Sequence, residues 1–258
     1  EARREIRQLI INMPPRHMKS SLVSVMWPVW TWISNPSEQW LFSSYAESLS
    51  IRDSRKCRNL IRSPWFQRHW GQRFKIVDDQ DEKKRFDNDH KGYRLATSVG
   101  GANTGEGGSI IVLDDPNNMK DINSSVVRQS VNDWYDQAMI SRLNDPKTGC
   151  RVCVQQRGHE DDMTGHLLSL KGWETLILPA RYEGAQPPTS IGWVDPRIAP
   201  GELLWPERFG EIELGDLERT MGPTTAAGQL QQRPAPAGGS TFQLLGRGYG
   251  IDGSGLGV

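Results

Sequence analysis

The chain has 258 residues, enough for one large or two small domains, with 36% hydrophobic residues and a formal net charge of zero. It is therefore no polycation, and a nucleic-acid partner would need a local basic face. No signal peptide is visible and no apolar run approaches the ~20 residues of a membrane span, so no membrane association is expected. Three cysteines, an odd number, argue against a disulfide framework and fit a reducing compartment. Cys150 and Cys153 are interpreted as strand residues, because no second Cys/His pair accompanies them.

The first motif combines an apolar run at residues 9–11, a proline-stiffened turn and a Lys-Ser pair that opens an apolar-periodic segment. This order predicts a strand, a phosphate-binding loop and a helix, whose positive N-terminal end favours anions. Lys19 is expected to reach the β- and γ-phosphates, and the Ser20 hydroxyl to bind Mg²⁺. The residues expected to contact the nucleotide are Pro15, Arg16, His17, Met18, Lys19, Ser20 and Ser21.

This loop departs from the usual pattern. In the frame G-x-x-x-x-G-K-S, Met13 and Met18 occupy the two glycine places. If Met18 has to be left-handed, the conformation costs roughly 1–2 kcal/mol. The alternative interpretation is a strand-to-helix turn that carries an exposed lysine.

The next part of the chain separates charge strongly. A strand is predicted at residues 40–45 and a helix at 46–62, and the bases from residue 51 to 75 outnumber a single acid, Asp53. Aromatic residues interleave with these bases, so the stretch could follow a phosphate backbone or could be a solvated helix face with its aromatics packed inward. The acids of residues 78–89 could pair with it. The eight bases are Arg52, Arg55, Lys56, Arg58, Arg62, Arg68, Arg73 and Lys75.

A strand is predicted at residues 93–99, and a glycine-rich loop at 100–108 leads into a fully apolar strand that ends in Asp114 and Asp115. A central parallel strand places such acids at the carboxyl edge of its sheet, where ligands bind. Asp114 is expected in the Mg²⁺ shell, and Asp115 where it can orient or deprotonate the attacking water. Two acids in an ordinary turn are the alternative.

The second half alternates predicted helices and strands. A helix at residues 123–143 precedes a strand at 151–156, whose last residue, Gln156, could touch the attacking water and the γ-phosphate. The acids near His159 could suggest a metal site, but helix N-capping explains them more simply. A short helix at 163–170, a strand at 173–179, an irregular stretch at 181–206 and one helical piece at 211–232 follow.

Taken together, these motifs resemble the ATPase part of a tailed-bacteriophage terminase large subunit. The resemblance implies an α/β P-loop NTPase of the additional-strand, RecA-like type: a three-layer sandwich with a mostly parallel sheet and a small C-terminal lid. It divides the chain into a core (residues 1–200), a lid or linker (201–239) and a loose or truncated tail (240–258). The matching stretches, in order, are residues 13–21, 85–88, 110–116, 156–165, 203–209 and 229–234.

The resemblance also implies a function: ATP and Mg²⁺ would drive double-stranded DNA into a procapsid. The expected partners are the portal, the small terminase subunit and further copies in a ring, in the host cytoplasm and transiently on the portal. Lys19, Asp115 and Gln156 take catalytic roles by position, and Ser20 and Asp114 hold the metal. Arg16 could sense the γ-phosphate. Because Glu106 stands where some relatives have an arginine, the arginine finger is left open among Arg94, Arg128 and Arg142.

Two other functions remain open. A degenerate P-loop module that binds DNA or the portal without hydrolysing ATP is supported by the methionine-for-glycine changes. A helicase-like DNA translocase normally needs a second motor domain, for which this length leaves no room. Nor is there room for the carboxylate cluster of a terminase nuclease, so no cleavage of DNA is expected from this chain.

Overall fold

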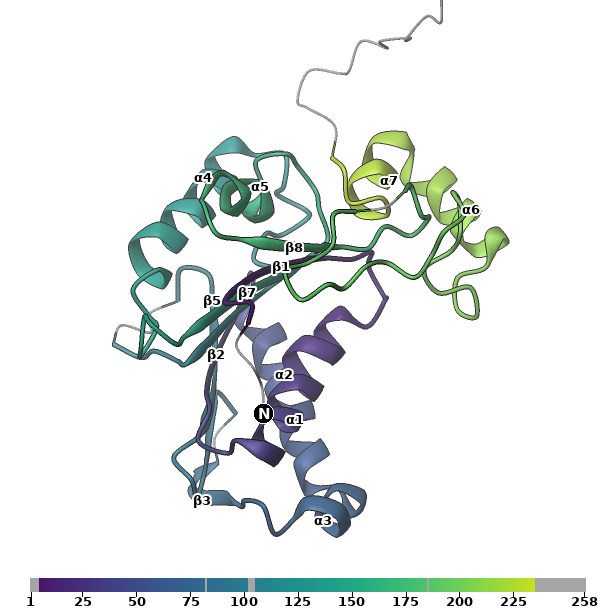
Figure 1. Ribbon diagram of the computed structural model, residues 1–258. Helices are drawn as coiled ribbons and strands as arrows, with labels where there is room; N and C mark the ends of the chain where they lie inside the picture. Colours follow the sequence, from purple (N-terminus) through teal and green to yellow (C-terminus); the bar gives the residue numbers. More distant parts are fainter. Residues whose placement is uncertain (1–4, 82, 102–104, 185, 235–258) are drawn as a thin grey trace, which may run out of the picture.

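A computed structural model describes residues 5–81, 83–101, 105–184 and 186–234. Its described strands form one eight-stranded sheet in the order β3-β4-β5-β2-β6-β7-β1-β8, with helices on both faces (Figure 1). The predicted α/β P-loop-type sandwich with a mostly parallel sheet is confirmed. Among the described residues, no helix is both long enough and apolar enough to cross a membrane.

Six strands form the parallel part of the sheet, and their order positions the site. β7 lies between β1 and β6 and pairs in parallel with both, which is the arrangement of the additional-strand type. β6 and β7 are almost wholly buried, as expected of central strands covered on both faces. The bounds are β1 Gln8–Asn12, β2 Gln39–Ser44, β5 Tyr93–Ser98, β6 Ile110–Asp114, β7 Cys150–Gln155 and β8 Glu174–Ile177.

The edge of the sheet that ends in β3 is antiparallel, and the sequence did not predict its strands. β3 (Ile76–Asp81) pairs with β4 (Arg85–Asn88), and β4 pairs with β5. The charged sequence hid these strands, because only Phe86 and Asn88 of β4 are buried. The side chains of residues 78–82, which include most of the acidic stretch, lie outside the described residues.

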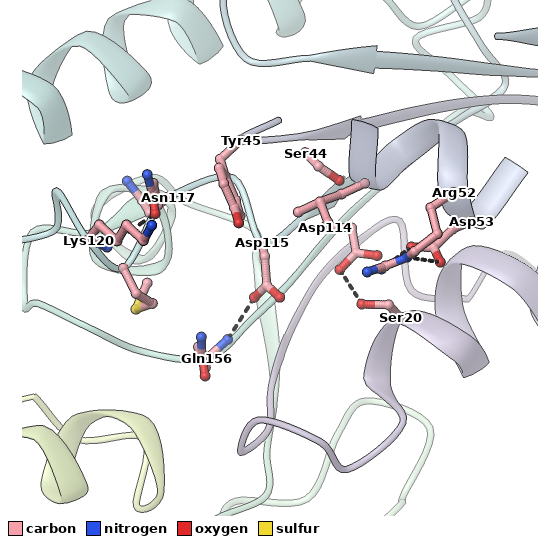
Figure 2. A pocket seen from close by; sticks show the side chains of 13 residues that line it. Ser20, Ser44, Tyr45, Arg52, Asp53, Asp114, Asp115, Asn117, Lys120 and Gln156 are labelled. Carbon is pink, nitrogen blue, oxygen red and sulfur yellow. Dashed lines mark hydrogen bonds and ion pairs between the residues drawn. The ribbon is translucent and has the colours of Figure 1, made fainter. Parts of the chain in front are cut away.

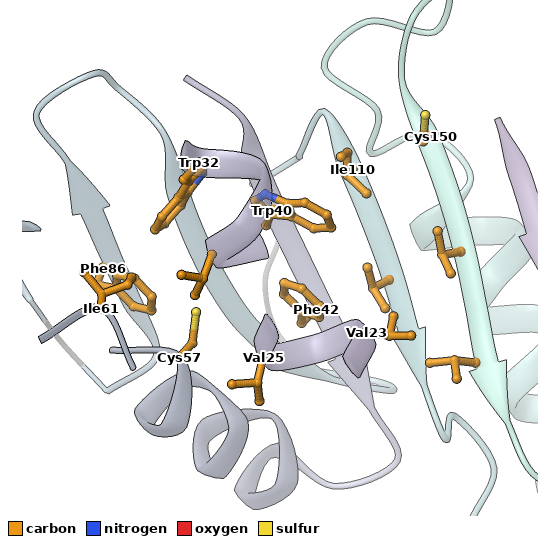
Figure 3. Close-up of a cluster of buried hydrophobic side chains, with 14 of the residues drawn as sticks. Val23, Val25, Trp32, Trp40, Phe42, Cys57, Ile61, Phe86, Ile110 and Cys150 are labelled. Carbon is orange, nitrogen blue, oxygen red and sulfur yellow. The ribbon is translucent and has the colours of Figure 1, made fainter. Parts of the chain in front are cut away.

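Each face of the sheet has its own hydrophobic core. On one face, η1 (Ser21–Met26), α1 (Trp27–Ser34), α2 (Glu47–Arg62) and α3 (Pro64–Trp70) cover a cluster rich in aromatic rings (Figure 3). On the other face, α4 (Ser125–Trp134), η2 (Tyr135–Met139) and α5 (Met163–Ser169) cover the second cluster. The first cluster includes Trp32, Trp40, Phe42, Cys57, Ile61 and Phe86.

The C-terminal region packs as a small third cluster. The predicted single helix of residues 211–232 was wrong: Gly222, with a φ of 74°, separates α6 (Glu211–Met221) from α7 (Pro223–Gln229). Several backbone hydrogen bonds cross the predicted boundary at residue 200, among them Tyr182 to Glu202 and Leu204 to Ala180. The division at that residue stays a prediction, and residues 240–258 of the predicted tail lie outside the described residues.

Substitution of Trp32 tests how much the packing of the aromatic core contributes to stability. Its ring is fully buried against Phe74 and Phe86, and its indole N–H donates to the backbone oxygen of Glu38 over 2.8 Å. Trp32→Ala should lower the free energy of unfolding by about 3–5 kcal/mol, since it leaves a cavity and an unpaired carbonyl. Urea unfolding measures this change. Trp30→Ala, on the exposed face of the same helix, is the control, and an equal loss in both variants would contradict the packing.

Candidate nucleotide-binding site

The predicted phosphate-binding loop joins β1 to η1 at the carboxyl edge of the sheet. Two of its residues are left-handed, Arg16 with a φ of 65° and Met18 with a φ of 61°. Met18 therefore adopts the backbone conformation for which this place usually carries glycine. Because a side chain is disfavoured there, the loop stores roughly 1–2 kcal/mol at this residue.

The loop meets the two acids that follow β6. The Lys19 ammonium lies 2.9 Å from the Asp115 carboxylate. The Ser20 hydroxyl donates to Asp114 over 2.9 Å, and the Ser24 hydroxyl donates to the second oxygen of Asp114 over 2.6 Å. The structure thus brings together the cation, hydroxyl and carboxylates that the sequence placed about a hundred residues apart. Figure 2 shows Ser20, Asp114 and Asp115 of this group.

Burial makes the Asp114 carboxyl group a weaker acid than usual. Loss of hydration and the neighbouring Asp115 charge raise the pKa of Asp114 to about 6, against the opposing effects of Ser24, Lys19 and Ser20. A divalent cation would relieve this repulsion. The Ser20 hydroxyl and Asp114 carboxylate supply the oxygen ligands that Mg²⁺ prefers, so these two residues fit a magnesium site.

A cavity of about 320 Å³ opens beside these groups. Gln156 enters it from the residue after β7, and its backbone N–H donates to Asp115 over 3.2 Å. Its carboxamide oxygen is buried and has no hydrogen-bond partner among the described residues. A ligand donor, such as a water molecule, would satisfy that oxygen. The other lining residues include Ser20, Ser44, Tyr45, Arg52, Asp53, Asp114, Asn117 and Lys120.

Sequence reasoning missed Arg52 and Lys120 as residues of this cavity. Arg52 comes from α2, forms an ion pair with Asp53 over 2.8 Å, and extends toward Asp114 in Figure 2. Lys120 lies in the segment after β6. The signal was topological: β2 pairs in parallel with β6, so the segments that follow these strands meet at one edge. Strand order could not be read from the sequence.

The three candidate arginines lie elsewhere. The Arg94 guanidinium is enclosed by its own chain, 4.1 Å from the centre of the Phe42 ring and hydrogen-bonded to the backbone oxygen of Ser24. Arg128 is also buried and donates to the Ile122 carbonyl over 2.7 Å. Arg142 donates to the Ala138 carbonyl over 3.1 Å and is partly exposed. In the described part of the chain, none of the three lines the cavity.

His17 connects the loop to the C-terminal region. Its ring is only 5% exposed and stacks on Phe209, with centroids 4.7 Å apart, while Trp205 meets it edge-on. Its Nδ1 lies 2.9 Å from the Pro15 carbonyl oxygen. Burial lowers the pKa of His17 and thus favours the neutral ring. The structure places the His17 ring against this aromatic pair. The predicted contact of His17 with a nucleotide stays a prediction.

The segment after Gln156 is fixed by a buried ion pair. The Arg157 Nε lies 2.9 Å from Asp162, and the Arg157 backbone N–H donates to the side chain of Gln232 over 3.1 Å. Asp162 also caps α5 by accepting from the Gly165 N–H, which confirms the expectation of an acidic N-cap. This segment therefore connects the cavity to the C-terminal region through a second path.

The topology and this edge cluster define an α/β sandwich of the P-loop type. No protein-family model matches the sequence, and no curated protein is similar to it. Solved structures identify the fold more closely as that of phage large terminase ATPase domains. The ATPase domain of the Thermus phage P74-26 large terminase shares it with a TM-score of 0.58 and 8% identity, over 90% of each chain.

Two longer proteins show the same fold. The HK97 bacteriophage large terminase matches with a TM-score of 0.54 and 12% identity, over 88% of this chain and 47% of its own. The large terminase of a thermophilic bacteriophage, solved in complex with ADP, matches with a TM-score of 0.51 and 8% identity, over 88% of this chain and 48% of its own. The chain thus spans most of an isolated ATPase domain and about half of these longer terminases.

Met18 offers a test of the strained loop. Met18→Gly should leave the free energy of unfolding unchanged or raise it by up to about 1 kcal/mol, because relief of strain offsets the freer unfolded chain. Met18→Val should lower it by about 1–2 kcal/mol. Met26→Gly, at the end of η1 with a right-handed φ of −75°, is the control and should lose about 1 kcal/mol. Equal losses for the two glycine variants in urea unfolding would contradict a left-handed Met18.

Asp114 makes stability depend on pH. Its native pKa of about 6 lies above the ordinary value of 3.8, so the native state binds more protons than the unfolded state between these limits. Stability should therefore fall as pH rises from about 4 to about 6. Asp114→Asn should remove this dependence and be more stable than the parent at pH 7 by on the order of 1–3 kcal/mol. Urea unfolding without nucleotide measures the difference in stability between Asp114→Asn and the parent. Glu213→Gln, at an exposed position, is the control. A stability difference between Asp114→Asn and the parent that does not change with pH would contradict the raised pKa of Asp114.

Proposed function

We propose that this chain hydrolyses ATP. The observation that carries the proposal is the meeting of Lys19, Ser20, Asp114 and Asp115 at one edge of the sheet, beside a cavity. The fold of terminase ATPase domains supports it, as does the ADP held by one protein of that fold. ATP and Mg²⁺ are the proposed substrate and cofactor, with Pro15, Arg16, Met18 and Ser21 supplying further contacts in the loop.

In the proposed reaction, Lys19 leaves Asp115 and neutralises charge on the β/γ oxygens of the nucleotide. Asp115, once released, accepts a hydrogen bond from the attacking water and holds it in line with the γ-phosphorus. Gln156 places its unpartnered carboxamide oxygen where it accepts from the same water. Ser20 and Asp114 would hold a magnesium ion, which supplies charge neutralisation when it is bound.

The motor role is part of the proposal. The chain would move double-stranded DNA into a procapsid as the ATPase module of a large terminase, with the portal, the small terminase subunit and further copies in a ring as partners. It would act in the host cytoplasm and transiently on the portal. Among the interleaved aromatics of the basic run, Phe66 and Phe74 are buried, so these two cannot stack on bases. Trp65 of the same run is exposed, and the contacts with DNA that we propose are made to phosphates without reading sequence.

An arginine from a neighbouring copy would complete the site. Arg94 is the least suited of the three candidates, because a neighbour could reach its enclosed guanidinium only after the core repacks. Arg142 is the most exposed of the three to solvent, and the exposure of Arg128 is intermediate between those of Arg94 and Arg142. Within the chain itself, Arg52 is the arginine that lines the cavity in the described residues.

A second candidate function is nucleotide or DNA binding without hydrolysis. The left-handed Met18 favours it, because a methionine side chain occupies a place where backbone usually comes close to phosphate. The two functions differ in one measurable property, the release of phosphate.

An ATPase assay separates them. The purified chain, with Mg²⁺ and with or without duplex DNA, should release phosphate. Lys19→Ala and Asp115→Asn should each lower turnover roughly a hundredfold or more, because each removes a group that acts on the reacting phosphate or water. Lys171→Ala, an exposed lysine after α5, is the control and should retain full activity. Absence of phosphate release under every condition, with nucleotide binding intact, would favour the non-hydrolysing alternative.

A further inference from the structure

The helical segment that follows the phosphate loop is apolar on both of its faces. Residues 21–34 contain no charged side chain. Val29 and Trp32 point into the core, whereas Met26 is 45% exposed and Trp30 is 61% exposed on the outer face. A helix that is apolar all round is normally enclosed by other structure. Among the residues that the structure describes, Met26 and Trp30 on the outer face of this one are left exposed.

That outer face continues into a groove of about 250 Å³. α1, α2 and α3 all contribute to it, and all of its lining side chains are apolar. Three tryptophans lie in it: Trp30, Trp65, which is 57% exposed, and Trp70. Tryptophan is enriched among the residues that dominate binding energy at protein interfaces, where it fills desolvated pockets. An exposed apolar groove with this composition indicates a protein-binding surface rather than ordinary solvated surface.

The chain segments that supply α2 and α3 of the groove are basic. Residues 54–75, which include most of α2 and all of α3, contain seven bases and no acid. Arg68 lies in α3, two residues from both Phe66 and Trp70 in the sequence, and Arg73 follows three residues after the helix ends. Both arginines are exposed. The groove is thus apolar and is built largely from basic segments, so a partner that combines an apolar stripe with acidic side chains complements it.

We propose that this groove binds an amphipathic helix of a partner protein. The apolar face of that helix would lie against Trp30 and Trp65, and its acidic residues would face Arg68 and Arg73. Duplex DNA matches the charge but not the apolar floor, because its outer surface presents phosphates that gain nothing from tryptophan rings. The groove shares no lining residue with the nucleotide cavity. The proposal therefore does not depend on ATP hydrolysis.

A designed peptide tests the proposal directly. The probe is a fluorescein-labelled amphipathic helix about 18 residues long, with leucine on one face and glutamate on the others. Fluorescence anisotropy with the whole chain should show saturable binding, and a peptide of the same composition with its leucines dispersed should not bind. Trp30→Ser with Trp65→Ser should weaken binding at least tenfold. Arg68→Glu with Arg73→Glu should weaken it severalfold and reduce its dependence on salt.

Matched controls make the result specific. Ile212→Ser changes an apolar residue that is 76% exposed on α6, and Lys171→Glu reverses a charge after α5. Both variants should bind the peptide as the parent does. Circular dichroism should show that all variants fold. If the double tryptophan variant does not fold, Met26→Glu places a charge in the groove without removing a ring and should give the same loss.

Several results would overturn the proposal. One is the absence of saturable peptide binding by the folded chain, and another is unchanged binding by the folded groove variants. Self-association that Trp30→Ser abolishes, without peptide binding, would assign the groove to a second copy of the chain. Duplex DNA binding that requires Trp30 and is not displaced by the peptide would assign it to nucleic acid.

Discussion

The ion pair between Lys19 and Asp115, 2.9 Å long, is the contact on which the site depends. It joins the loop after β1 to the end of β6, although β7 separates these two strands. The register makes this possible: Asn12 of β1 aligns with Gln155 of β7, and Asp114 of β6 aligns with Val154 of the same strand. All three strands therefore end at nearly the same level, where a lysine side chain can span the intervening strand.

The loop at this edge of the sheet has a strained backbone and is held in place by contacts with the C-terminal region. Left-handed Arg16 and Met18 flank His17, whose buried ring stacks on Phe209. This packing fixes a conformation that glycine would adopt freely but would not hold as firmly. Arg157 provides a second connection, through Gln232, from the opposite side of the cavity. The segments that flank the two C-terminal helices are thus joined to the loop on one side and to the segment after Gln156 on the other.

The sequence predicted the parts of this architecture that local patterns control. Apolar runs located β1, β6 and β7, and the acids after β6 were correctly placed at the edge of the sheet beside Lys19. It did not predict strand order, so Arg52 was missed as a residue of the cavity. β3 and β4 were missed because a charged edge hairpin lacks the apolar alternation of a strand. The position of His17 depends on residues almost two hundred positions away, a contact that no local pattern encodes.

The most direct test of the account is a structure of this chain bound to Mg²⁺ and a non-hydrolysable ATP analogue. The account predicts that the β- and γ-phosphates lie beside the Lys19 ammonium, with the metal between Ser20 and Asp114 and with Gln156 facing the γ-phosphate. A nucleotide bound elsewhere, or phosphates that leave the pair between Lys19 and Asp115 intact, would contradict it.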